Sequence, residues 1–167
     1  MNKKIMIVED DEEVRELYIA MLEESYSIIP ADSGRECLKK LGIEKPDLIL
    51  LDILMPDMNG WQVLERIKEN IEMGEIPVIM LSALLPEASA LDKEIAGYLT
   101  KPVSKQMLAR AIESAFKLRD LIREYKAALN SQINSIQIEE HKNKIQQFKK
   151  TLLSASKLQL KIESQAT

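Results

Sequence analysis

The chain has 167 residues, of which 46% are hydrophobic and 30% are charged, and its formal net charge is -4. This length fits one domain, or one domain with an appendage, and the composition is typical of a globular protein. The acidic balance argues against a protein that coats nucleic acid. A single cysteine, Cys37, excludes an intramolecular disulfide. The apolar runs are too short to cross a bilayer, and no signal-peptide core follows the opening residues MNKK. We therefore expect a cytoplasmic protein without a membrane segment.

The charges are unevenly distributed along the chain. Residues 1–102 contain 11 basic and 21 acidic residues, a net charge of -10, whereas residues 103–167 contain 12 and 6, a net charge of +6. This change of sign predicts two parts with different roles.

Five short apolar runs, rich in Ile, Val and Leu, recur in the acidic part. Such runs predict strands that are buried on both faces, here at residues 5–8, 27–30, 48–51, 78–81 and 97–99. Between them, apolar residues at three- and four-residue steps predict amphipathic helices. The second helix should open at Asp32-Ser33-Gly34 and be closed by Gly42 as a C-terminal cap. Strands that alternate with helices predict a doubly wound α/β domain with a five-stranded parallel sheet.

The basic part lacks Gly and Pro after Pro102, which predicts helix throughout. A helix after Pro102 can cover the sheet as far as Leu118. Beyond it, apolar residues follow a coiled-coil-like spacing in two sets, one from Leu118 to Ile136 and one from Ile145 to Ile162. We divide the chain into a domain at 1–118 and an all-α extension at 119–167, which forms either one long helix or a helical hairpin.

Polar side chains follow the predicted strands. Asp10 and Asp11 come after the first strand, Asp52 after the third, Ser82 after the fourth and Lys101 after the fifth. The carboxyl ends of parallel strands meet at one edge of a sheet, so these groups should converge. Three neighbouring carboxylates repel one another unless a cation offsets them, and oxygen ligands suit Mg²⁺. With a fixed cation and a hydroxyl, such a cluster suits phosphoryl transfer.

Four segments then carry a family resemblance: IMIVEDD (5–11), LILLDILMPDMNG (48–60), PVIMLSA (77–83) and GYLTKP (97–102). Together they resemble the receiver domain of two-component response regulators, over residues 1–118. The resemblance implies a flavodoxin-like (βα)5 fold and Asp52 as the phosphoacceptor. It also implies a Mg²⁺ site made by Asp10, Asp11, the side chain of Asp52 and the backbone carbonyl of Leu54.

The resemblance assigns roles to three further residues. Ser82 would hydrogen-bond a phosphoryl oxygen, Lys101 would pair with another, and Tyr98 occupies the family's aromatic switch position. A cis peptide bond would join Lys101 to Pro102. Structural alternatives exist for each position. Asp10 or Asp11 can cap the first helix, Lys101 can be a surface lysine, Ser82 a turn residue, and Tyr98 a packing residue.

Two features differ from the family pattern. Ser82 and Lys101 are 19 residues apart, shorter than usual, so the fourth helix of the domain should be shortened or partly unwound. The positions two residues after Asp52 and Ser82 hold Leu54 and Leu84, and neither side chain can position a hydrolytic water.

The expected function is a response regulator that accepts phosphate from a histidine kinase or phosphotransfer protein and acts on an unknown protein target. It would catalyse only its own phosphoryl transfer and dephosphorylation. The alternative is a phosphorylation-independent scaffold that acts through its helical tail. No segment resembles a DNA-reading module, so we do not expect direct DNA binding.

Three interpretations of the extension compete. Its apolar seam would pair with a second copy, which predicts a homodimer through residues 119–167. Its lysines would instead bind an acidic partner or nucleic acid. Finally, His141 lies three residues before Lys144, as in phosphotransfer helices, but Ile145 stands where a small residue is expected, which favours a solvent-exposed histidine.

Overall fold

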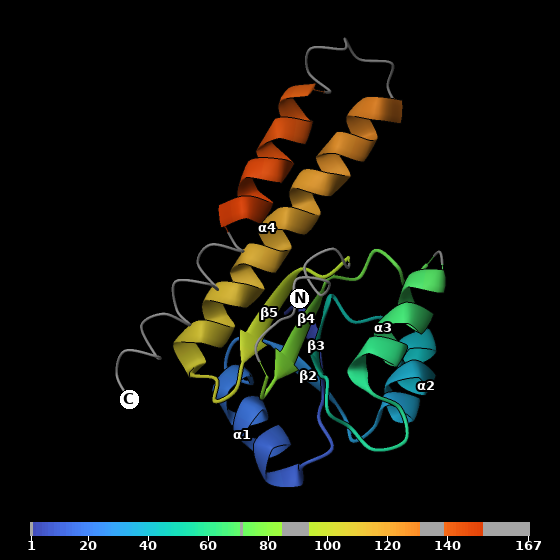
Figure 1. Ribbon diagram of the computed structural model, residues 1–167, viewed down its shortest axis with the longest axis vertical. Helices are drawn as coiled ribbons and strands as arrows, with labels where there is room; N and C mark the ends of the chain where they lie inside the picture. Colours follow the sequence, from blue (N-terminus) through green and yellow to red (C-terminus); the bar gives the residue numbers. More distant parts are fainter. Residues whose placement is uncertain (1, 71, 85–93, 131–138, 152–167) are drawn as a thin grey trace.

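A single parallel sheet forms the centre of the protein. The computed structural model (Figure 1) describes residues 2–70, 72–84, 94–130 and 139–151. The strands β1 (Lys4–Val8), β2 (Ser27–Ala31), β3 (Leu48–Asp52), β4 (Val78–Ser82) and β5 (Gly97–Thr100) are ordered β2-β1-β3-β4-β5, and all neighbours are parallel. The predicted doubly wound, five-stranded α/β fold is confirmed.

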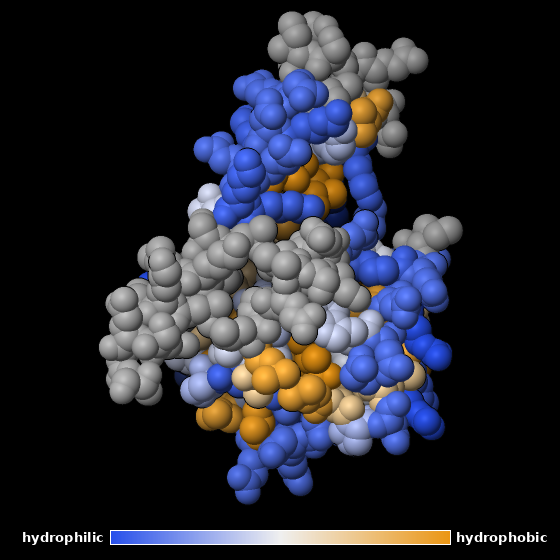
Figure 2. All heavy atoms as spheres, viewed as in Figure 1, coloured by the Kyte–Doolittle hydropathy of each residue, from blue (hydrophilic) through white to orange (hydrophobic). Residues whose placement is uncertain are grey.

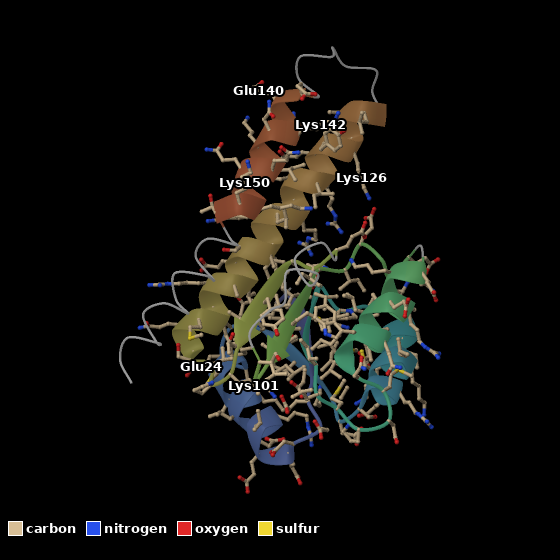
Figure 3. The ribbon with its side chains drawn as sticks, viewed as in Figure 1. Glu24, Lys101, Lys126, Glu140, Lys142 and Lys150 are labelled. Atoms are coloured by element: carbon tan, nitrogen blue, oxygen red, sulfur yellow. The ribbon has the colours of Figure 1, made fainter. Side chains whose placement is uncertain are left out.

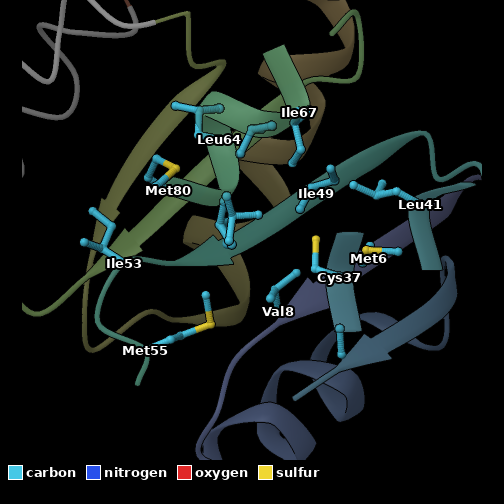
Figure 4. Close-up of a cluster of buried hydrophobic side chains, with 14 of the residues drawn as sticks. Met6, Val8, Cys37, Leu41, Ile49, Ile53, Met55, Leu64, Ile67 and Met80 are labelled. Carbon is cyan, nitrogen blue, oxygen red and sulfur yellow. The ribbon is translucent and has the colours of Figure 1, made fainter. Parts of the chain in front are cut away.

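Helices cover both faces of this sheet. The labelled helices are α1 (Glu12–Leu22), α2 (Gly34–Glu44), α3 (Gly60–Glu69) and α4 (Lys105–Asn130). Successive residues of a strand point to opposite faces, so Met6 and Val8 pack with the α2–α3 side and Ile5 and Ile7 with the α1–α4 side. Figure 4 shows the first of these clusters, which includes the fully buried Cys37. Burial raises the pKa of this thiol to about 12.

The second helix ends later than the sequence predicts. Ser33 caps its start, and its side chain accepts a hydrogen bond from the backbone N–H of Glu36 at 3.3 Å. Gly42, however, lies within α2, which ends at Glu44, and the C-cap is Lys45 in the left-handed conformation with φ 47°. The prediction that Gly42 caps the helix was therefore wrong. A non-glycine residue can occupy that conformation, although it does so uncommonly.

The extension begins as a direct continuation of the domain. Helix α4 runs without a break through residue 118 as far as Asn130, and residues 139–151 are also helical. Figure 1 shows this second helix running back along α4, and Lys149 lines the same cavity as Arg123 and Lys126. The described segments thus form a hairpin. The predicted short fourth helix falls largely on residues 85–93, outside the described residues.

No helix in the described part of the chain is both long and apolar enough to cross a membrane.

Candidate functional site

The functional side chains gather at the carboxyl edge of the sheet. Asp52 ends β3, Ser82 ends β4, and Lys101 follows β5. Backbone hydrogen bonds extend the ladder past the strand ends, because the N–H of Lys101 donates to the carbonyl of Ser82 at 2.7 Å and that of Ile53 donates to Leu81 at 2.9 Å. These bonds fix the direction in which each side chain leaves the sheet. The peptide bond between Lys101 and Pro102 is cis, as expected.

Three carboxylates converge at this edge. Oxygen atoms of Glu9, Asp10 and Asp52 all lie within 4.8 Å of one another. Glu9 and Asp52 are buried, with 2% and 3% of their surface exposed, whereas Asp10 is exposed. Three acids therefore converge on one edge of the sheet, as predicted, but the cluster contains Glu9 in place of Asp11.

Asp11 is not part of this cluster, contrary to our expectation that Asp10, Asp11 and Asp52 converge. It is the N-cap of α1, and its Oδ1 accepts a hydrogen bond from the backbone N–H of Val14 at 3.1 Å. The reason is where the strand stops. The N–H of Glu9 still donates to the carbonyl of Ala31 in strand fashion, at 3.1 Å, whereas Asp11 immediately precedes the helix.

Sequence reasoning missed Glu9, although it belongs to the same acidic run. A signal was available, since an Asp directly before the first residue of a helix is a common N-cap, its side chain accepting from the backbone N–H three residues on. Had Asp11 been assigned as the cap, Glu9 and Asp10 would have remained for the cluster. Arg15 holds this turn in place, because its guanidinium donates to the backbone carbonyl of Glu9 at 2.9 Å.

Lys101 is the cation of the site. Its ammonium lies 2.7 Å from Oε2 of Glu9 and 3.0 Å from Oδ1 of Asp52, and Figure 3 shows it at the end of the sheet near α1. Partial burial of the ammonium lowers the pKa of Lys101, but the hydrogen bonds to Glu9 and Asp52 outweigh this effect and leave the pKa above its ordinary value. Lys101 is therefore a fixed positive charge at neutral pH.

Glu9 has the opposite balance. Burial is the largest influence and raises the pKa of Glu9, and the charges of Asp52 and Asp10 raise it further. The hydrogen bond from Lys101 lowers the pKa but does not restore the ordinary value. The site thus contains more negative charge than its one ammonium offsets, and a bound cation would relieve that excess.

The loop after β3 is shaped by a close backbone contact. A Cβ added to Gly60 would lie within 3 Å of the backbone of Asp52 and Ile53, so only glycine fits there. The N–H of Gly60 donates to the carbonyl of Ile53 at 2.9 Å. The loop between them places Leu54 at the surface, with 56% of it exposed. Asp57, in the same loop, has φ 66°.

Ser82 and Tyr98 lie on neighbouring strands and contact the same residue. The Ser82 hydroxyl accepts a hydrogen bond from the N–H of Leu84 at 3.0 Å, and the Tyr98 hydroxyl donates to the Leu84 carbonyl at 2.9 Å. Ser82 and Tyr98 are buried, whereas 64% of Leu84 is exposed. The turn after β4 is thereby attached to β5.

Comparison with protein families agrees with this geometry. The family model for the response regulator receiver domain matches residues 5–113. The chain belongs to this receiver family. A curated relative is the alkaline phosphatase synthesis transcriptional regulatory protein PhoP of Bacillus subtilis, 34% identical over 125 residues. The match covers 72% of this chain and 51% of PhoP, so the receiver spans about half the length of that relative.

Solved structures give the same result. The N-terminal domain of a response regulator receiver protein from Methanoculleus marisnigri is 39% identical, with a TM-score of 0.57, and the match covers 66% of this chain and 93% of that one. The receiver domain of a sensor histidine kinase from Pseudomonas aeruginosa, solved with magnesium in its active site cleft, has a TM-score of 0.61 at 24% identity. That match covers 66% of this chain and 93% of the Pseudomonas domain, and it supports the fold alone.

Proposed function

We propose that Asp52 of this receiver accepts a phosphoryl group from a sensor histidine kinase or a phosphotransfer protein, in a reaction that requires Mg²⁺. The observation that carries the proposal is the double ion pair of Lys101 with Glu9 and Asp52 beside a third carboxylate, Asp10. A purely structural ion pair needs only one carboxylate per ammonium. Here two carboxylates pair with one ammonium and a third, Asp10, lies beside them, an arrangement that is costly unless further positive charge arrives.

The donor set fits a hard divalent cation. Glu9, Asp10 and Asp52 offer carboxylate oxygens, which Mg²⁺ prefers, and Asp10 is exposed, so water ligands can complete the shell. With all groups ionised, the three carboxylates and Lys101 sum to a formal charge of -2, which a divalent ion would neutralise. The backbone carbonyl of Leu54 is a further ligand in this proposal. A bound Mg²⁺ would offset the charge of the incoming phosphoryl oxygens.

The residues of the chain then have distinct tasks. Lys101 pairs with Oδ1 of Asp52, which leaves Oδ2 to attack the phosphorus of a phosphohistidine. The new O–P bond forms as the P–N bond breaks, and its electron pair stays on the imidazole of the donor. In this proposal, Lys101 and the Ser82 hydroxyl bind the phosphoryl oxygens. The protein would catalyse only its own phosphorylation and dephosphorylation, unlike an enzyme that converts many substrate molecules.

Phosphorylation would change the structure beyond the site through the contacts of Ser82 and Tyr98 with Leu84. Ser82 and Tyr98 both hydrogen-bond to the backbone of Leu84. Movement of the Ser82 hydroxyl toward a phosphoryl oxygen would therefore shift Leu84 and change the hydrogen bond of Tyr98. The target would be a protein that contacts this surface or the extension. Leu54 and Leu84 are apolar and exposed beside the site, so neither can position a water for hydrolysis, and we expect a slow loss of phosphate.

The extension offers an interface for a second copy of the chain. Leu129 is 44% exposed, and Tyr125, Ile145 and Phe148 are only half-buried. In Figure 2, apolar side chains lie between the hydrophilic surfaces of the two helices of the extension. Two helices bury such a seam in part, whereas two hairpins can bury it as a four-helix bundle. A homodimer is therefore part of the proposed function.

Phosphorylation can be tested by incubating the full chain with Mg²⁺ and acetyl phosphate and measuring its intact mass. We expect a gain of one phosphoryl group that is absent in Asp52→Asn and without Mg²⁺. Asp57→Asn is the matched control, because it makes the same change in the same loop and Asn tolerates a positive φ. Absence of a mass gain in the wild type would favour the scaffold, whereas a gain that persists in Asp52→Asn would mean that another residue accepts the phosphoryl group.

A further inference from the structure

A cavity of about 270 Å³ opens at the edge of the sheet opposite to Asp52. Its floor includes Ile76 and Pro77, which precede β4, and Ile95, which precedes β5. The strands are parallel, so these residues lie at the amino ends, remote from the phosphoacceptor. The other walls come from α4 and from Lys149 in the second helix of the extension. Receiver and extension thus build this cavity together.

The cavity combines an apolar floor with an excess of positive charge. Apolar contact comes from Ile76, Ile95, Leu118 and Ile122. The charged groups that line it are five basic and two acidic side chains, Lys68, Arg119, Arg123, Lys126 and Lys149 against Glu75 and Glu94. In a chain whose net charge is -4, this local excess of cations runs against the average.

Some of these cations already have partners. Lys126 lies 2.6 Å from Glu75 Oε1, and Arg119 lies 3.5 Å from Asp47 Oδ1. Figure 3 shows Lys126 on the part of α4 that is remote from Lys101. Within the described residues, Arg123 and Lys149 form no ion pair, and both line the cavity and are exposed. Two cations are therefore available to an anion that enters.

Lys68 is a further cation that lines the cavity. Its ammonium donates to the backbone carbonyl of Gly74 at 2.7 Å and is half-buried. Burial lowers the pKa of Lys68, and the charge of Lys126 lowers it further, while Glu94 raises it. An anion near this ammonium would stabilise its charged form.

We propose that this cavity binds a small amphipathic organic anion, with an apolar ring against Ile76, Ile95 and Ile122 and an acidic group at Arg123 and Lys149. Ligand pockets typically measure about 300–1,000 Å³, so a volume of about 270 Å³, just below that range, suits a compact ligand of one or two rings. The ligand would contact the receiver through the floor and the extension through Arg123 and Lys149. Its binding would therefore hold the hairpin against the receiver, independently of phosphorylation at Asp52.

The proposal is tested with naphthalene-1-sulfonate as probe, by isothermal titration of the full chain. We expect one binding event, with affinities at least about tenfold weaker for sodium sulfate and for 1-naphthalenemethanol, since each lacks one of the two required parts. Equal binding of sulfate would mean that the surface charge alone attracts the probe and would overturn the proposal. Equal binding of the neutral alcohol would overturn it as well, because an acidic group would then be unnecessary.

Variants locate the binding. Arg123→Glu should weaken the sulfonate at least about tenfold, and Lys149→Glu should also weaken it. Arg110→Glu makes the same change at an exposed arginine of α4 that does not line the cavity, and should bind like wild type. Arg123 and Lys149 are exposed, so we expect unchanged melting temperatures. Full binding in both Arg123→Glu and Lys149→Glu, or equal losses in Arg110→Glu, would refute the assignment.

Discussion

Ser82 and Tyr98 are linked through a single residue, because Ser82 accepts a hydrogen bond from the N–H of Leu84 and Tyr98 donates one to its carbonyl. The two side chains come from adjacent strands, β4 and β5. Any change in the hydroxyl bonding of Ser82 therefore acts on the residue that keeps the Tyr98 hydroxyl in its buried position. This short path connects Ser82, at the sheet edge that carries Asp52, to Tyr98 on β5.

Tyr98→Phe removes one side of this link. We expect a loss of about 0.5 kcal/mol in the free energy of unfolding, the low end of the usual range, because the Leu84 carbonyl can bond to water instead. Urea unfolding would measure it. Phosphorylation by acetyl phosphate should persist, since Tyr98 makes no hydrogen bond to Asp52 in the described structure. Tyr26→Phe is the control, because Tyr26 is a half-buried residue whose hydroxyl donates to no described residue. Equal losses would mean that the Leu84 bond contributes nothing.

Substituting Ala for Asp10 or for Asp11 should affect the Mg²⁺ dependence of the melting temperature differently. Mg²⁺ should raise the melting temperature of the wild type, because the acidic cluster proposed to bind it is assembled only in the folded protein. Asp10→Ala should abolish this rise, since Asp10 belongs to the acidic cluster. Asp11→Ala should lower stability by about 1 kcal/mol through loss of the helix cap but retain the rise.

Thermal unfolding with Mg²⁺ or with EDTA would separate the two roles. The pair is matched in residue type, position and substitution, so general effects of losing an acid cancel. If Asp11→Ala loses the Mg²⁺ response and Asp10→Ala keeps it, the metal site includes the cap residue and the assignment from the cluster is wrong.

Glu9 should make the metal-free protein sensitive to pH. Burial raises the pKa of Glu9 in the folded state above its ordinary value of 4.5. The folded protein then binds this proton more tightly than the unfolded chain does, so its contribution to stability is complete below pH 4.5 and is lost as the pH rises through the raised pKa. In EDTA, the melting temperature should fall over that interval.

Glu9→Gln should reduce this fall and raise the melting temperature at neutral pH by a few degrees, because the amide carries no charge and its oxygen can still accept from Lys101. Mg²⁺ should lessen the fall in the wild type by stabilising the ionised form. A pH profile in EDTA that is identical in wild type and Glu9→Gln would show that another group causes the dependence.

Two glycines test how the site is shaped. Gly60→Ala should destabilise the protein by several kcal/mol and reduce phosphorylation, because its Cβ would overlap the backbone carbonyl of Asp52. Gly42→Ala should instead stabilise by about 1 kcal/mol, since Gly42 lies in the exposed interior of α2 with nothing within 4 Å of an added Cβ. Chemical unfolding of both variants measures the contrast. Similar effects would contradict the close contact at Gly60.

The sequence predicts the sheet because each strand is a short apolar run, and it predicts the edge that carries the site because polar residues follow most of these runs. The strand that ends in Asp52 was expected within one residue of its observed end. The choice between Asp11 and Glu9 was missed because it depends on where β1 stops and α1 starts, and boundaries are the weakest part of any pattern. The cavity near Lys68 could not be predicted, since its walls come from segments far apart in the chain.

The oligomeric state depends on the exposed end of the extension. Leu129 is 44% exposed on α4, and helices in proteins gain most of their stability from packing an apolar face against other structure. We expect a dimer of the full chain by light scattering at tens of micromolar, and Leu129→Glu should dissociate it because a charge within an apolar seam is costly. Ala127→Glu places the same charge two residues away on the exposed surface and should remain dimeric. A wild type that is monomeric with and without acetyl phosphate would rule out the dimer. Dissociation by both variants would mean that the interface is not confined to the apolar seam at Leu129.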